Sequence, residues 1–204
     1  MYRSGDASEA VELRTAIPRR AELPVDRGVL VTASATLKQK NRFFTFVQTE
    51  HGDLFKVSLV HEGTDVSELK VKYFDTIPPA ASLCIFRKGF LFAASEFGDH
   101  HLYQFLGLGD DDAVESSSVE VKLENGAYDG MDVDRMTDQV TFEPRYPMVN
   151  LDRVDTLTSL APTIDMKIAN LLGEETPQIF CACGRGAQSS VRMLRPGLQV
   201  NELA

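Results

Sequence analysis

The fold is decided by the stretch FLFAASEFGDHHLYQF, residues 90–105. Residues 90–95 are apolar on both alternating faces, which is typical of a strand buried on both sides. Gly98 follows within a polar interruption and can supply the positive φ that a tight turn needs. His101 and Tyr103 then share one face of a second run of strand-forming residues. The stretch therefore predicts two antiparallel strands joined by a tight turn.

The same unit occurs twice more along the chain. In the first copy, strand-like residues flank the turn EHGD (50–53), which matches EFGD (96–99) if His is counted as aromatic. In the last copy, a glycine turn separates the apolar run 179–183 from the strand-like run 189–194. We expect Asp99 to bond the backbone of its own turn. The turn residues that we expect to be structural are Gly52, Asp53, Gly98, Asp99, Gly184 and Gly186.

Strand-forming residues recur between turn signals over most of the chain. Four sequential candidates with short connections predict an antiparallel meander, and the series restarts after two prolines. In residues 68–73 charged and apolar side chains alternate, which predicts a half-exposed strand at the outer edge of its sheet. The predicted strands are 28–35, 42–49, 54–59, 68–73, 80–86, 89–95, 100–106, 163–171, 179–183 and 189–194, with 119–123 as the fourth strand of the second unit and a return to order at 149–160.

The spacing of these units predicts a β-propeller. Gly52 and Gly98 are 46 residues apart, and Gly98 and Gly186 are 88 apart, which also becomes 46 if residues 107–148 are an insertion. A period in the forties with four strands per unit is typical of propeller blades. We therefore expect an all-β chain, a partial β-propeller of about three four-stranded, WD40-like blades. Because rings have at least four blades, the chain would be a fragment of a multi-propeller protein, would close with partners, or would hold a different number of blades.

Acidic residues are concentrated in one segment. The net charge is −9, and residues 109–138 hold ten acids and two bases, which leaves 20 acids and 19 bases elsewhere. We expect an acidic, flexible insertion at about 107–147 and a disordered N-terminus at 1–16. Because the remainder is near neutral, it lacks a basic footprint for nucleic acid, and we expect no direct RNA contact. The polar N-terminal residues and the lack of long apolar runs predict a soluble chain without a secretory signal, with reduced cysteines.

Two pairs of residues resemble metal or redox sites but fit structural roles better. Cys181 and Cys183 would share one face of a strand, yet two thiols are too few for a structural zinc site, and Cys84 is distant in sequence. We expect the pair to pack as small apolar side chains. His100 and His101 are adjacent and would point to opposite faces, so we expect turn and surface histidines rather than metal ligands.

Three further motifs also have structural explanations. Residues 184–190, GRGAQSS, have the glycines of a phosphate loop but lack its Lys and precede a strand. Residues 132–134 lack the Gly and the bidentate Glu of a calcium loop. Arg19 and Arg20 could contact a partner, but we expect them on a solvated face. With no nucleophile elbow or metalloprotease motif, the sequence predicts no catalytic, metal-binding or cofactor-binding residue, and so a protein-binding scaffold rather than an enzyme.

Six segments match a known family. They are QTEHGDLFK (48–56), LKVKYFDT (69–76), GFLFAASEFGDHHLY (89–103), LGDDD (108–112), ACGRG (182–186) and LR (194–195). They closely resemble the family of splicing factor 3b subunit three, a large multi-propeller protein of the U2 snRNP, over about residues 17–203. Wider relatives are the damaged-DNA-binding adaptor of ubiquitin ligases and the large cleavage-and-polyadenylation specificity subunit, but these motifs are specific to the splicing subunit.

The resemblance implies a non-catalytic scaffold of the splicing factor 3b complex, acting in pre-mRNA splicing and branch-site engagement in the nucleus. The implied partners are the other subunits, notably a HEAT-repeat subunit, and further spliceosomal proteins, with no membrane contact. Residues 17–204 would be the late blades of the first propeller, with an acidic insertion longer than the family pattern. The alternative is a propeller adaptor of a cullin-type ubiquitin ligase or of the cleavage and polyadenylation machinery.

Overall fold

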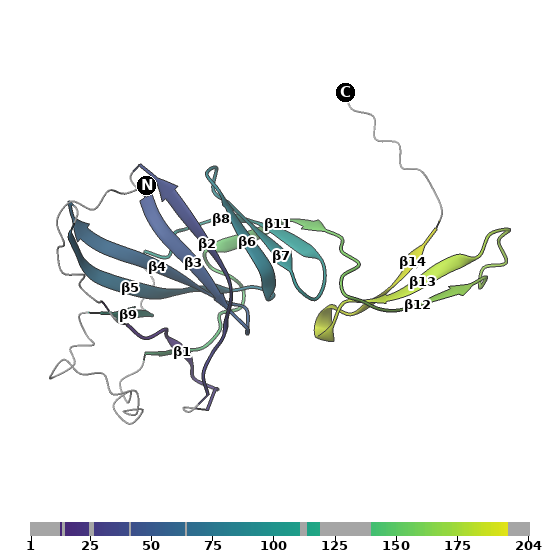
Figure 1. Cartoon of the computed structure of the whole chain (residues 1–204), viewed down its shortest axis with the longest axis horizontal. Coiled ribbons are helices and arrows are strands. Elements are labelled where there is room, and N and C mark those ends of the chain that lie inside the picture. Colours follow the sequence, from purple (N-terminus) through teal and green to yellow (C-terminus); the bar gives the residue numbers. More distant parts are fainter. Residues whose placement is uncertain are drawn as a thin grey trace, which may run out of the picture.

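The computed structural model consists almost entirely of β-strands and short connections, which confirms the predicted all-β fold (Figure 1). It describes residues 13, 15–24, 27–40, 42–63, 65–110, 114–118 and 140–195. In this part of the chain, no helix is long and apolar enough to cross a membrane.

The strands form three antiparallel sheets and one short parallel pair. The first sheet has the order β2 (Val31–Gln39), β3 (Arg42–Thr49), β4 (Asp53–Glu62), β5 (Asp65–Thr76) and β9 (Glu115–Ser117). The second has the order β11 (Leu151–Leu157), β8 (His100–Phe105), β7 (Phe90–Ser95) and β6 (Ala80–Phe86). The third has the order β12 (Thr163–Ala169), β13 (Gln178–Cys183) and β14 (Ser190–Leu194), with the 3₁₀ turn η2 (Gly186–Gln188) before β14. β1 (Arg19–Arg20) pairs in parallel with β10 (Thr141–Phe142).

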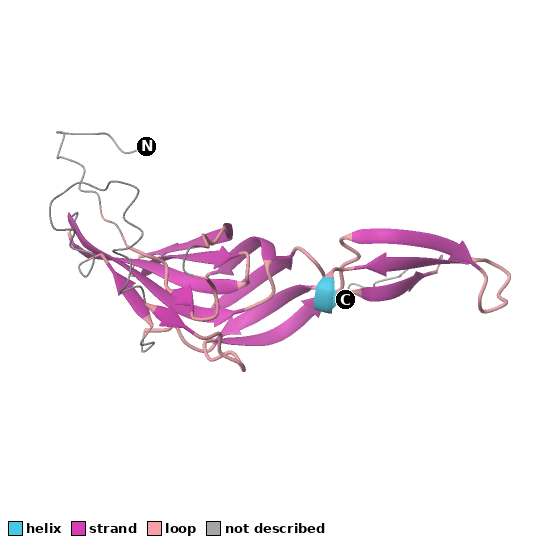
Figure 2. Cartoon of the chain, turned by 90° about the horizontal axis from the view of Figure 1, so that it is seen from below, coloured by secondary structure: helices cyan, strands magenta, loops and turns pink. Residues whose placement is uncertain are grey.

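The first two sheets lie against each other, and the third sheet projects away from them (Figures 1 and 2). Each sheet contains one of the predicted strand–turn–strand units, so each corresponds to a blade. Only the second sheet has the predicted four strands, because β9 adds a fifth strand to the first sheet and the third has three strands within the described residues. We call them the first, second and third blades. The predicted strands 42–49 and 80–86 recur with the same bounds as β3 and β6, and most others differ by a few residues at their ends.

The hairpin that decides the fold forms as predicted, from β7 and β8. Leu91 lies opposite Tyr103 in this pairing, and both side chains are buried. Along β7, however, burial alternates: Leu91, Ala93 and Ser95 are buried, whereas the residues between them are half-buried. Only one face of β7 therefore lies in the core, and the predicted burial of both faces is wrong.

The fourth strand of the second blade is β11, not residues 119–123. β11 runs antiparallel to β8, with Leu151 opposite Phe105 and Leu157 opposite His100. The predicted strand 119–123 lies outside the described residues. Alternating apolar and charged residues favour a strand in that segment. The position beside β8 is occupied instead by β11, which follows the acidic segment in the chain.

β5 is not the outer edge of the first blade, because β9 pairs with it. The alternating charges that predicted an edge strand are paired across this contact. Lys70 Nζ lies 2.8 Å and Lys72 Nζ 2.9 Å from carboxylate oxygens of Glu115. The charged side chains of residues 68–73 face away from the core, as their alternation predicts, but they contact β9 as well as solvent.

Two short strands fall within the segment 107–147, for which the sequence predicts flexibility. β9 pairs with β5, and β10 pairs with β1. Residues 111–113 and 119–139 of this segment lie outside the described residues, as do residues 1–12 and 14 of the predicted disordered N-terminus. The described ends of the acidic segment are thus part of the fold.

The main core lies between the first and second blades. Three aromatic rings meet there, with Phe46 and Phe74 from the first blade and Phe105 from the second, at centroid distances of 4.7, 5.8 and 6.1 Å. The buried residues around them are Ala33, Phe44, Leu54, Ile77, Ala80, Leu83, Leu91, Ala93, Tyr103 and Leu151. Because both blades contribute to one cluster, neither can be removed without exposing the other.

A second core cluster covers the opposite face of the first blade. It contains Phe55, Val71, Tyr73 and Phe142, with Ile17 packed against it. The rings of Tyr73 and Phe142 are stacked with centroids 4.2 Å apart. Ile17, just before β1, and Phe142, in β10, therefore cover the second apolar face of the first blade, which would otherwise be exposed to solvent.

The third blade belongs to neither cluster. Its first strand, β12, alternates as the sequence predicts, but the apolar side chains Ile164, Met166 and Ile168 are 66%, 62% and 66% exposed. Its stability within the described residues therefore comes from hairpin pairing and from the contacts with the second blade described below.

We expect Phe46→Ala to lower the free energy of unfolding by about 3–5 kcal/mol, because it opens a cavity where the two blades meet. Phe43→Ala is the matched control: it lies on the same strand, its side chain is 48% exposed, and it should cost under about 1 kcal/mol. Urea unfolding followed by circular dichroism measures both, and equal losses would contradict the placement of the core.

Candidate functional site

The turn between β3 and β4 requires glycine at position 52 for two reasons. Gly52 has φ +87°, a conformation that L side chains rarely adopt. A Cβ at this position would also overlap the carbonyl oxygen of Ile77. This close approach of the two backbones allows the Ile77 N–H to donate a hydrogen bond to the Gly52 carbonyl at 3.0 Å. The turn thus holds the connection from the first blade to the second.

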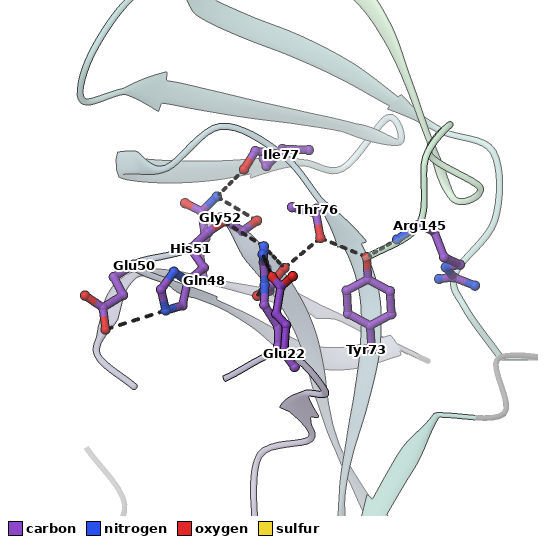
Figure 3. Close-up of polar contacts among 11 residues, drawn as sticks. Glu22, Gln48, Glu50, His51, Gly52, Tyr73, Thr76, Ile77 and Arg145 are labelled. Atoms are coloured by element: carbon purple, nitrogen blue, oxygen red, sulfur yellow. Dashed lines mark hydrogen bonds and ion pairs between the residues drawn. The ribbon is translucent and has the colours of Figure 1, made fainter. Parts of the chain in front are cut away.

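Asp53 follows this turn and accepts three hydrogen bonds. Arg20 donates two of them, with Nε at 2.6 Å and Nη2 at 2.8 Å, and Thr76 Oγ1 donates the third at 2.7 Å. Thr76 in turn contacts the hydroxyl of Tyr73, which accepts from the Arg145 N–H (Figure 3). The Asp53 carboxylate raises the pKa of Arg20. The network joins β1, β4, β5 and the segment after β10.

The arginine pair is therefore not on a solvated face. Arg20 binds Asp53 as above, and Arg19 is buried with Nη2 donating to the Leu23 carbonyl. The sequence prediction was wrong because Arg20 binds the buried carboxylate of Asp53, 33 residues away, as well as the exposed carboxylate of Glu22, and no local pattern reveals the distant partner.

Gln48 is fully buried and joins the first two blades through their backbones. Its amide nitrogen lies 3.3 Å from the carbonyl oxygen of Gly52 and 3.4 Å from that of Ile77 (Figure 3). The same nitrogen lies 3.1 Å from the Pro78 carbonyl oxygen, and the amide oxygen accepts from Ala80 N–H at 2.9 Å. A side chain with both a donor and an acceptor is needed here, because both kinds of backbone group are buried.

Asp75 is also fully buried and accepts hydrogen bonds from three consecutive backbone N–H groups. These belong to Val149 at 3.1 Å, Asn150 at 2.8 Å and Leu151 at 2.9 Å. Burial raises the pKa of Asp75, and the three donors act in the opposite direction. The contact fixes the start of β11 and hence the fourth strand of the second blade.

Gly98 lies in the corresponding turn of the second blade, but its φ is not positive. The predicted reason for this glycine is therefore wrong. A Cβ on Gly98 would overlap the side chain of Gln188 in η2, and Gln188 also contacts Ser95 Oγ. The glycine is required because the turn of the second blade packs directly on the third blade.

Asp99 pairs with the third blade and not with its own turn. Its carboxylate accepts from Ser159 N–H at 2.9 Å and from Arg192 Nη2 at 3.0 and 3.1 Å. The hydrogen bond from Ser159 lowers the pKa of Asp99, and Arg192 acts in the same direction. In both copies of the Glu-aromatic-Gly-Asp motif, the Asp thus binds an arginine from a distant element.

The glycine turn of the third blade completes this junction. Gly184 has φ +80°, and a Cβ there would overlap the backbone of Gln188. Arg185 N–H donates to the Phe97 carbonyl at 3.0 Å, and its guanidinium lies 5.7 Å from the Phe97 ring. Gly186 has φ +59° with open space beside it, so its glycine serves the backbone conformation alone.

The cysteine and histidine pairs occupy structural positions. Cys181 and Cys183 are buried free thiols on β13. His101 is buried with Nδ1 3.3 Å from Thr156 Oγ1, and burial lowers its pKa, whereas His100 points to the other face against Phe92. The opposite orientations are confirmed, but His101 is not a surface residue. In the described residues, no three His, Cys, Asp or Glu side chains are grouped to hold a metal.

The candidate site is therefore a pair of blade junctions. Of the six predicted turn residues, Gly52 and Asp53 lie at one junction, and Gly98, Asp99 and Gly184 lie at the other, with Gly186 beside it. Sequence reasoning missed the buried or distant partners, which are Arg20, Gln48, Asp75, Gln188 and Arg192. For the Arg20–Asp53 pair, the signal available in the sequence is Asp53 itself, a charged residue directly after the turn glycine Gly52.

We expect Gly98→Ala to destabilise the chain by about 1–3 kcal/mol, because its methyl group would displace Gln188. Gln188→Ala removes Oε1 and Cδ, two of the three Gln188 atoms that a Cβ at Gly98 would meet, and keeps the third, Cβ. The double variant should therefore cost less than the sum of the two single variants. A double-mutant cycle by urea unfolding measures the coupling, and strict additivity would contradict the contact.

We expect the junction between the second and third blades to weaken in acid. The folded-state pKa of Asp99 lies below its ordinary value of 3.8, so its contribution is present above about pH 4 and is lost as the pH falls through the folded pKa. The protection of residues 178–194 against hydrogen–deuterium exchange, taken as the observed rate relative to the intrinsic rate at the same pH, should fall over this range. Asp99→Asn should exchange faster at neutral pH and lose this acid dependence, and an unchanged profile would contradict the assignment.

Comparisons with known proteins agree with the blade architecture and the sequence resemblance. A family model described as the RSE1/DDB1/CPSF1 first beta-propeller matches residues 1–156. The chain is 53% identical over 193 residues to Spliceosome-associated protein 130 A of Arabidopsis thaliana, and 46% identical over 195 residues to Splicing factor 3B subunit 3 of Danio rerio. Each alignment covers 95% of this chain and 15% of the relative.

A fungal relative gives the same result. Pre-mRNA-splicing factor RSE1 of Mycosarcoma maydis is 49% identical over 197 residues, which cover 94% of this chain and 16% of that protein. The chain thus spans about 15% of the length of these relatives. The family match covers more than half of the chain and coincides with the first two blades and their junction. The chain therefore belongs to the RSE1/DDB1/CPSF1 first β-propeller family.

Proposed function

We propose that this chain is part of a non-catalytic, protein-binding scaffold of the spliceosome, within the splicing factor 3b complex of the U2 snRNP. The observation that carries the proposal is the 46–53% identity, along nearly the whole chain, to relatives named for splicing. The alternatives, a cullin-type ubiquitin ligase adaptor or a cleavage and polyadenylation subunit, have no comparable relative among these proteins.

The geometry of the blade junctions supports a scaffold. Asp53, Asp75 and Asp99 each accept hydrogen bonds from groups that join elements of the fold, so these carboxylates serve structure. Buried and fully bonded polar contacts of this kind hold neighbouring elements in one arrangement. Fixed blades present their turns and loops in a constant geometry to protein partners.

We further propose that residues 17–204 form late blades of the first propeller of a longer protein that works in the nucleus. The partners would be other splicing factor 3b subunits, notably the HEAT-repeat subunit, without direct contact to RNA. The names of the relatives support membership of such a complex.

Affinity purification of the tagged native gene product from nuclear extract, followed by mass spectrometry, tests the proposal. We expect the other splicing factor 3b subunits in the eluate and nuclear fluorescence of the tagged protein. Phe43→Ala should retain these partners and Phe46→Ala should lose them, because only the second disrupts the packing of the blades. Recovery of a cullin in place of splicing proteins would contradict the proposal.

A further inference from the structure

A cleft of about 420 Å³ opens between the first and second blades, at the end where β2 turns into β3 and β6 turns into β7. β2 and β6 lie against each other beside it (Figure 1). Its floor is apolar and is formed by Leu37, Phe44, Ile85 and Phe105. Two further apolar side chains, Phe86 and Leu106, line it and are 47% and 64% exposed.

The rim of this cleft is basic. Arg42, Arg87 and Lys88 line it, and Lys38 and Lys40 adjoin it on the same β2–β3 hairpin. All five side chains are exposed, and no Asp or Glu among the described residues lines the cleft. None of the five forms an ion pair within the described residues, whereas the other lysines of the first blade, Lys56, Lys70 and Lys72, all do. Five cations without an ion pair among the described residues, in a chain of net charge −9, mark a surface that complements an acidic partner.

The cleft is held open by contacts on both sides. Gln39 Nε2 donates to the Arg87 carbonyl at 3.4 Å, which ties the two basic turns together. On the opposite side, Leu106 N–H donates to the Asn150 carbonyl at 2.8 Å, and Lys56 Nζ donates to the Leu108 carbonyl at 2.6 Å. A site that exists before its ligand arrives loses less conformational entropy on binding.

We propose that this cleft binds an acidic peptide segment of a partner protein, with an apolar side chain on the floor and carboxylates on the surrounding cations. The inference deepens the proposed function and rests on it only in that a scaffold binds proteins. A short peptide fits better than RNA for two reasons. The cleft has the volume of a few side chains, and RNA binding needs a basic track that follows many phosphates.

Fluorescence polarisation with the purified full chain tests this inference. The probe is a short labelled peptide of Asp and Glu around a central Phe-Leu pair, and its counterpart carries Lys in place of the acids. We expect saturable binding of the acidic peptide that weakens with added salt. The double variant Arg87→Glu/Lys88→Glu should weaken binding by about tenfold or more, because two attractive charges become repulsive.

The variant Arg153→Glu/Lys167→Glu is the matched control. It makes the same change in net charge at two exposed positions, on β11 and β12 away from the cleft, and should change affinity by no more than about twofold. Phe86→Ser tests the apolar contact and should weaken the Phe-Leu peptide several-fold, but leave unchanged any weak binding of an all-acidic peptide. Circular dichroism checks that each variant is folded.

Three outcomes would overturn the inference: no saturable binding by the wild-type chain, equal losses in the two charge-reversal variants, or oligouridine RNA that binds more tightly than the peptide and displaces it. Because all components are purified, these outcomes are distinct from a failure of the splicing role. Absence of splicing proteins from the affinity purification, with intact peptide binding, would reject the splicing role and leave the cleft assignment standing.

Discussion

The carboxylate of Asp75 is the contact on which the second blade depends. It accepts hydrogen bonds from the three consecutive backbone N–H groups of residues 149–151. These bonds fix the position and direction of the chain where β11 begins. β11 then pairs with β8 from Leu151 opposite Phe105, with one shift of register between Arg153 and Asp155, and Leu151 joins the main core. Leaving one buried donor unpaired costs about 1–3 kcal/mol, so a return of the chain that lost these hydrogen bonds would be less stable.

Local information in the sequence was enough for the hairpins. The turns at Gly52, Gly98 and Gly184 were placed correctly, because alternation of apolar residues and glycine between them are properties of adjacent residues. The number of blades followed from the spacing of those turns. The choice of β11 over residues 119–123 could not be made in this way, because it is decided by Asp75, some 75 residues earlier.

The candidate site shows the same division between local and distant information. Asp53 and Asp99 were identified from a repeated motif, but Arg20 and Arg192 come from elements that the motif does not contain. Both copies of the motif place a carboxylate at the end of a blade. In each copy, that carboxylate binds an arginine of the element that packs there. Gly98 further shows that one residue type can satisfy different constraints in two copies of a motif: Gly52 combines a positive φ with close packing, whereas Gly98 is explained by close packing alone.

The parallel pairing of β1 with β10 joins residues that lie about 120 positions apart. During synthesis, the first blade can form its hairpins long before Phe142 leaves the ribosome. Until then Phe55 and Tyr73 lack the ring that covers them in the finished fold. The nascent chain therefore exposes these two aromatic rings from the synthesis of β5 until Phe142 has left the ribosome and β10 has paired with β1.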